Sequence, residues 1–454
     1  MQDNKNFLGT EPVGKLLLKL SIPTVIAQLI NMLYNIVDRI YIGHIPGEGS
    51  LALTGVGVCM PIIMIVSAFA ALVSSGGAPR ASIYMGKQDN KSAENILGNC
   101  FILQIIISAI LTAILLIWGR DLLLAFGASE NTISYATDYM SYLRFWYLVR
   151  TVNPWHECIH HCAGIYHIFH GFRPDRCYLQ YCSGILYLSL YFHMGVRGAA
   201  LATVISQAIS TLWVVLFLCG KKTQLHLRKK HLHLEAKVVL PCIALGLAAF
   251  IMQSSESIVT VCFNSSLLRY GGDIAVGAMT ILTSVMQFAM LPLQGIAQGA
   301  QPISSYNYGA KNADRVKKTF RLLLITCLSY SVLLWAAVQL VPRVFVSIFT
   351  ADTSLIEFTA PMLKIYLGGL FLFGIQIACQ MTFTSLGKAV NSIIVAVVRK
   401  FVLLIPLIYI MPHMISDSTT GVYMAEPIAD ITAVIFTSVL FTFQFKKALA
   451  EIQN

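Results

Sequence analysis

Long apolar runs recur along the whole chain, separated by shorter polar segments. A helix of about 20 apolar residues crosses the roughly 30 Å hydrocarbon core of a membrane. We therefore expect a transmembrane helix in each of eleven runs, five in the first half of the chain and six in the second. The runs are Leu17–Val37, Leu51–Ser75, Cys100–Trp118, Ile133–Leu148, Val196–Cys219, Val239–Phe263, Val276–Ile296, Leu322–Val341, Phe358–Ser385, Ile393–Met411 and Val422–Phe441.

The two halves of the chain also repeat one another. The segment Pro79–Gly86 (PRASIYMG) is echoed by Pro302–Gly309 (PISSYNYG), and Ser82 and Ser305 are 223 positions apart (305 − 82). Internal repeats are common in transporters, with the substrate path between them. We expect an all-α polytopic membrane protein of twelve transmembrane helices, one of them damaged, in two pseudo-symmetric six-helix lobes. The lobes are placed at residues 1–220 and 238–454, with a basic cytoplasmic linker at 221–237.

Composition and charge support a membrane protein. Only 12% of the residues are charged, whereas soluble domains average about 25%. The net charge is +11, and the Lys and Arg residues gather in alternate loops, above all in 221–237 and 311–321. Such loops lie on the cytoplasmic side, so we expect a multi-pass protein of the cell membrane with both termini in the cytoplasm. We interpret the linker as a surface for anionic lipid headgroups rather than for nucleic acid, and expect a monomer in the lipid bilayer.

A polar face marks the first apolar run. Asn31, Asn35 and Asp38 are spaced four and three apart, and Gln28 extends the same helix face by three positions. An ionisable group inside a membrane span is a candidate functional residue. These oxygens are suited to a coupling Na⁺ or H⁺. The alternative is that Asp38 lies near the helix end and pairs with Arg39 or water.

Polar residues also interrupt the apolar runs of the second half. Gln253 is 225 positions after Gln28 (253 − 28), so Glu256 falls at the depth of Asn31. Arg399 lies in the middle of an apolar run, where we expect it to face inward; the alternative is that it reaches the interface together with Lys400. Glu426 and Asp430 share one helix face and either line a second polar cavity or pair with Arg399. The C-terminal cavity set is thus Gln253, Glu256, Arg399, Glu426 and Asp430.

Several motifs resemble the multidrug and toxic compound extrusion (MATE) family. They are Ser21-Ile22-Pro23 through Asp38 to Gly43-His44, the segment Gln298–Ala310, and Gly421–Asp430. The resemblance implies a two-lobed, twelve-helix antiporter that exports organic cations in exchange for Na⁺ or H⁺. It matches Asp38 to the family's first-helix acid and Glu256 to the seventh-helix acid of one branch. The tenth-helix acid of that branch is absent, because the corresponding run carries Gln376 and Gln380.

The sequence therefore predicts a transporter and not an enzyme. No Walker motif is present, so we expect a secondary active antiporter without cofactors, driven by Na⁺ or H⁺. We expect amphipathic, cationic drugs or toxic metabolites to bind among Tyr34, Met286 and Phe288 and to leave by alternating access. The alternative is a flippase for lipid-linked precursors from the same superfamily.

Residues 146–192 depart from this pattern. The segment holds five His and four Cys, and His156-Glu157-Cys158-Ile159-His160 satisfies the HExxH zinc-hydrolase motif. This motif raises the alternative of a membrane zinc metalloprotease that uses His156, Glu157 and His160. We reject it, because reading the His and Cys codons one base later yields apolar residues typical of a membrane helix. We interpret the segment as a frameshifted stretch and expect no metal site.

Overall fold

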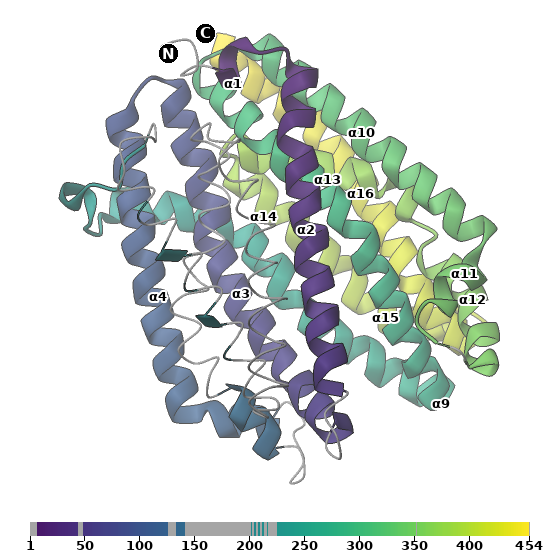
Figure 1. Cartoon of the computed structure of the whole chain (residues 1–454). Helices are drawn as coiled ribbons and strands as arrows, with labels where there is room; N and C mark the ends of the chain where they lie inside the picture. Colours follow the sequence, from purple (N-terminus) through teal and green to yellow (C-terminus); the bar gives the residue numbers. More distant parts are fainter. Residues whose placement is uncertain are drawn as a thin grey trace. The chain divides into compact units, whose positions relative to one another are not determined.

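The chain folds into long helices in a computed structural model that describes residues 7–43, 49–125, 133–140, 225–350 and 352–453, with isolated positions between 201 and 216. Before the linker come α1 (Phe7–Thr10), α2 (Val13–Gly43), α3 (Gly49–Gly86) and α4 (Asn90–Ala125) (Figure 1). No strand occurs in these ranges. The segment 146–192, with His156, Glu157 and His160, lies outside them.

The second half begins with a short 3₁₀ turn, η2 (Lys229–His231), and the long α9 (Ala236–Gly309). Gly272 divides α9 into two helices, because its φ of 65° lies in the left-handed region that glycine adopts readily. The remaining elements are α10 (Ala313–Leu340), α11 (Pro342–Ser347), α12 (Thr353–Tyr366), α13 (Leu370–Ser385), α14 (Ala389–Val397), η3 (Val398–Leu404), α15 (Ile405–Met414) and α16 (Ser418–Gln453).

Seven helices in the described part of the chain are long and apolar enough to cross a membrane, and the pair α12 and α13, bent by 48°, makes up to eight. Six of these spans lie after residue 235, which confirms the six runs expected in the second half. In the part that the structure describes, the protein is an all-α polytopic membrane protein.

The chain divides into two compact units that do not coincide with its two halves. Unit 1 comprises Met1–Leu8 and Ile26–Phe250, and unit 2 comprises Gly9–Val25 and Ile251–Asn454. The beginning of α2 therefore belongs with the second half, and the beginning of α9 belongs with the first. The lobe boundaries expected at 220 and 238 stay a prediction.

A close helix crossing in each unit requires glycine. In unit 1, a Cβ atom on Gly76 of α3 would lie 1.8 Å from the carbonyl oxygen of Cys242 in α9, and one on Gly246 would lie 1.7 Å from that of Leu72. In unit 2, a Cβ atom on Gly299 would lie 2.7 Å from the Cα atom of Ser21 in α2. Gly76 and Gly299 are 223 positions apart (299 − 76), the spacing of the sequence repeat. The two crossings are therefore counterparts in the two halves.

The linker before α9 is fixed to α4. Arg228 Nε lies 3.0 Å from Glu94 Oε2, and the backbone N–H of Glu235 donates to Asn99 Oδ1 at 2.6 Å. A hydrogen bond from His233 lowers the pKa of the Glu235 carboxyl group below its usual value. The linker is thus packed against the polar end of α4.

Candidate functional site

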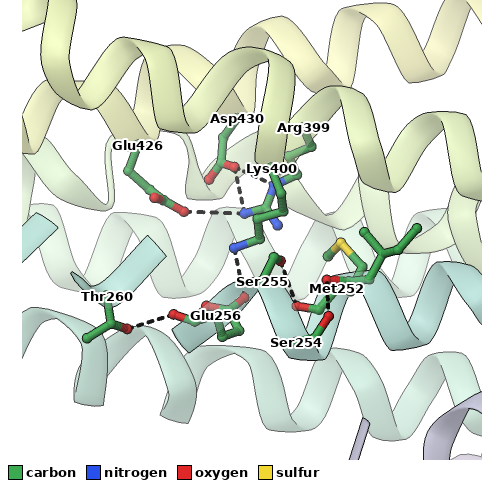
Figure 2. Close-up of polar contacts among 10 residues, drawn as sticks. Met252, Ser254, Ser255, Glu256, Thr260, Arg399, Lys400, Glu426 and Asp430 are labelled. Carbon is green, nitrogen blue, oxygen red and sulfur yellow. Dashed lines mark hydrogen bonds and ion pairs between the residues drawn. The ribbon is translucent and has the colours of Figure 1, made fainter. Parts of the chain in front are cut away.

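Charged residues from three elements of unit 2, four of them buried, gather in one cluster (Figure 2). Two of them, Arg399 and Lys400, are neighbours in η3, a π-helical stretch between α14 and α15. Both side chains are nearly inaccessible, at 4% and 3% exposed. Successive residues of an α-helix point about 100° apart, so the wider π turn helps both side chains reach the interior. π-helical turns are frequent at functional sites.

Arg399 binds the two acids of α16. Its Nε and Nη2 atoms each lie 2.8 Å from Asp430 Oδ1, and Nη2 lies 3.4 Å from Glu426 Oε1. Its guanidinium also lies over the ring of Phe373 in α13, with 4.5 Å between the guanidinium carbon and the ring centroid. Of the two roles open for Glu426 and Asp430, this structure has them pairing with Arg399.

Lys400 binds a different carboxylate. Its Nζ atom lies 2.7 Å from Glu256 Oε1 in α9. The Glu256 side chain is 49% exposed, although that of Lys400 is not. Gln253 and Thr260, three positions before and four after Glu256, are exposed on the same helix face. One member of the cluster is thus accessible from outside it.

The charges in this cluster do not cancel when all groups are ionised. Two cations, Arg399 and Lys400, face three carboxylates, Glu256, Glu426 and Asp430, which leaves one negative charge in excess. A buried charge without a partner costs several kcal/mol. The cluster can therefore balance its charge by binding one proton or one monovalent cation. Glu426 has the longest contact and is the acid that is least compensated.

The candidate coupling residues of the first half lie on α2, which is helical from Val13 to Gly43. A helix over these positions is the backbone that the spacing of Asn31, Asn35 and Asp38 requires for a common face. The side chains of Asn31, Tyr34, Asn35 and Asp38 lie outside the described part, and Gln28 is partly buried. Whether these oxygens converge on an ion stays a prediction.

Met286 and Phe288 lie on the second helix of α9, which follows the division at Gly272. They are two positions apart, so their side chains point to different sides of the helix. Phe288 is 40% exposed, and Met286 is partly buried. Within the described ranges, no three His, Cys, Asp or Glu side chains are arranged to hold a metal ion.

Sequence reasoning missed Lys400 and Phe373 as members of the site. Neighbouring residues of an α-helix point in different directions. The sequence therefore gives no reason to expect that Lys400 is buried together with Arg399. Its burial depends on η3, which the apolar pattern of the run does not reveal. Phe373 lies in an apolar helix where aromatic residues are ordinary, so no sequence signal distinguishes it. The one sequence signal that could have pointed to Lys400 was the charge balance, because the three apolar runs that carry this cluster hold two cations and three acids.

The chain is similar to known proteins over nearly its whole length. The MatE family model matches residues 23–169 and 247–410. The multidrug export protein MepA of Staphylococcus haemolyticus (strain JCSC1435) is 22% identical, over 99% of this chain and 98% of that protein.

Solved structures agree with this family match. The structure of the MATE multidrug transporter DinF-BH is 32% identical with a TM-score of 0.86, over 97% of this chain and 98% of that one. A MATE crystal structure in the bent conformation has a TM-score of 0.91 at 20% identity, covering 99% of both chains.

Proposed function

The chain belongs to the MatE family of multidrug efflux transporters, and we propose that it exports amphipathic organic cations in exchange for Na⁺ or H⁺ by alternating access. The observation that carries this proposal is the uncompensated carboxylate of the buried cluster, since a site with one excess negative charge suits a monovalent cation. The energy source is the ion gradient, and no cofactor takes part.

Asp38 is the proposed coupling acid of the first lobe, with Gln28, Asn31 and Asn35 as neighbouring ligands. An acid inside an apolar helix exchanges a proton or cation readily, because its charge is costly when it is unpaired. The residues proposed to contact the cationic substrate remain Tyr34, Met286 and Phe288. The proposed orientation keeps both termini and the basic linker in the cytoplasm.

Cation export is favoured over a lipid-linked precursor flippase by the partners of the buried cations. A phosphate-bearing substrate requires cations that are free to bind it. Arg399 and Lys400 are each engaged by carboxylates at 2.8 Å and 2.7 Å. The cluster therefore presents an excess of negative rather than positive charge.

The direct test is ethidium transport into or out of proteoliposomes under an imposed H⁺ or Na⁺ gradient. In a version of the protein with an intact fifth helix, Asp38→Asn should abolish coupled export, while Asp121→Asn, which changes an exposed acid on α4, should leave it unchanged. Normal export by Asp38→Asn at wild-type protein levels would show that coupling lies elsewhere. The gradient that drives export identifies the coupling ion.

The frameshift interpretation calls for two versions of the gene in this test. The chain as it stands should transport little, whereas a version shifted by one base over codons 146–192 should export ethidium. Full export by the unshifted chain would refute the interpretation, and one tightly bound zinc per molecule, lost in His156→Ala, would restore the metalloprotease alternative.

A further inference from the structure

We propose that Lys400 moves between two carboxylates, Glu256 and Glu426, so that the cluster in unit 2 holds either a proton or an organic cation, but not both. This inference rests on the proposed function, because it assumes that the substrate is a cation. It assigns Lys400 the role of a positioning residue that links proton release to substrate binding.

The first step of the argument is the unequal accessibility of the Lys400–Glu256 pair. The Glu256 side chain lies half exposed on α9, whereas the Lys400 side chain is buried. Glu256 is therefore the member of this pair that an incoming cation meets first. Lys400 already occupies Glu256 at 2.7 Å, so the cation can form a full ion pair only when Lys400 leaves.

The second step identifies the carboxylate that receives Lys400. Asp430 accepts both short contacts of Arg399, so Glu426 retains only a contact of 3.4 Å to the same guanidinium. Figure 2 shows Glu426, Asp430, Arg399 and Lys400 in one cluster, and the Lys400 charge acts on Glu426. The charged and titratable groups facing Glu426 are Asp430 on α16, Arg399 and Lys400 on η3, Glu256 on α9 and Tyr366 on α12. Of the two cations among them, Arg399 is paired with Asp430, so Lys400 is the one that can pair with Glu426.

The third step is the balance of charge. With a proton on Glu426, the pairs Lys400–Glu256 and Arg399–Asp430 make the cluster neutral. When that proton leaves to water, Lys400 pairs with Glu426, Glu256 pairs with the organic cation, and the cluster is neutral again. A buried site avoids net charge, so both states are favoured over the states in which proton and cation are both bound or both absent.

In the proposed transfer, the group that moves is the Lys400 side chain. Lys carries a compact charge on a flexible four-carbon stem, whereas the planar Arg fork fits one bound arrangement. Arg399 is further fixed by Phe373. The chain thus places a mobile cation beside a fixed one, and the mobile cation is the one that contacts the accessible acid.

The test is a double-mutant cycle on binding of tetraphenylphosphonium to the purified full chain in detergent, between pH 6 and pH 8. All variants carry Asp38→Asn, so that the proposed first-lobe site does not contribute. In the protein that carries only Asp38→Asn, protonation of Glu426 should weaken tetraphenylphosphonium binding. Once Glu426 is protonated, the Kd should rise about tenfold for each further unit of falling pH, because one proton exchanges for one cation.

The two single variants should act in opposite directions. Glu426→Gln imitates the protonated acid, holds Lys400 on Glu256, and should weaken binding at least tenfold at pH 8. Lys400→Gln leaves Glu256 open and should bind equally well at pH 6 and pH 8. Glu357→Gln and Lys364→Gln, on the exposed part of α12, are the matched controls and should change neither the Kd nor its pH dependence.

The double variant separates a moving lysine from simple electrostatics. If Lys400 moves, Lys400→Gln with Glu426→Gln should bind within about twofold of Lys400→Gln alone, because Glu426 acts only through Lys400. If the charges act independently, the tenfold loss should persist in the double variant, and this result would overturn the proposal.

Proton release provides a measurement that does not require Lys400→Gln to fold. In weak buffer with a pH indicator, cation binding should release up to one proton from the protein with intact Lys400 and Glu426, and none from Glu426→Gln. Equal release by both proteins would refute the role of Glu426. These experiments use no gradient, so failure of the cycle with normal ethidium export rejects the lysine transfer alone, whereas absence of cation export by the version shifted over codons 146–192 rejects the proposed function.

Discussion

Arg399 is constrained from several sides at once. Asp430 binds two of its nitrogen atoms, Glu426 contacts one of the same two, and Phe373 covers the guanidinium. These contacts compensate for the removal of a charged group from water. The residue therefore acts as a fixed charge around which the acids of α16 are arranged.

Arg399→Met should destabilise the protein by about 3–5 kcal/mol, because it leaves buried acids without a cation. Thermal unfolding in detergent measures this change, and Arg321→Met, at an exposed position of α10, is the control. Adding Asp430→Leu and Glu426→Gln to Arg399→Met should recover most of the loss. If Arg399→Met unfolds at the same temperature as Arg321→Met, then Arg399, Asp430 and Glu426 do not stabilise one another.

At the residue scale, the sequence supports part of this site. The spacing of four between Glu426 and Asp430 predicts a common face, and the position of Arg399 in an apolar run predicts its burial. The pairing of Lys400 with Glu256 could not be predicted, because the two residues are 144 positions apart (400 − 256) and nothing local relates them. Long-range packing alone decides which cation meets which acid.

At the scale of elements, η3 and the linker have features that the hydrophobic pattern and the composition do not predict. The apolar run Ile393–Met411 predicts a helix, which is found, but not the π-helical turns at Val398–Leu404. The basic composition of the linker predicts contact with lipid headgroups, but it does not predict the polar contacts with α4. Those contacts use Glu94, Asn95 and Asn99, which in sequence resemble an ordinary polar helix end.

Gly98→Leu should detach the linker from α4, because a Cβ atom at Gly98 would lie 2.2 Å from the carbonyl oxygen of His231. Limited digestion with trypsin measures the effect, since Arg228, Lys229 and Lys230 are its cleavage sites. We expect cleavage there to become about tenfold faster, in line with a local opening that is roughly 1.4 kcal/mol easier. Ile110→Leu, at an exposed position of α4, should not alter the rate. Unchanged cleavage of Gly98→Leu would mean that the linker is held by other contacts.

At the scale of the whole molecule, the repeat was the most informative property of the sequence. The spacing of 223 positions predicts two related bundles, and Gly76 and Gly299 occupy equivalent close crossings at that spacing. The exchange of helix beginnings between the two units was not predicted. A repeat relates each half to the other, but it does not say with which half the first helix packs.

This exchange has a consequence for how the protein is made. Gly9–Val25 leaves the ribosome long before Gly295 and Gly299, against which it packs in unit 2. Fragments 1–222 and 223–454, produced in separate cells, should each be degraded, because each lacks a helical stretch that belongs to its core and carries one that belongs elsewhere. Produced together, they should associate and accumulate in the membrane. A fragment 223–454 that is stable alone and melts like the intact chain would show that unit 2 does not need the early stretch.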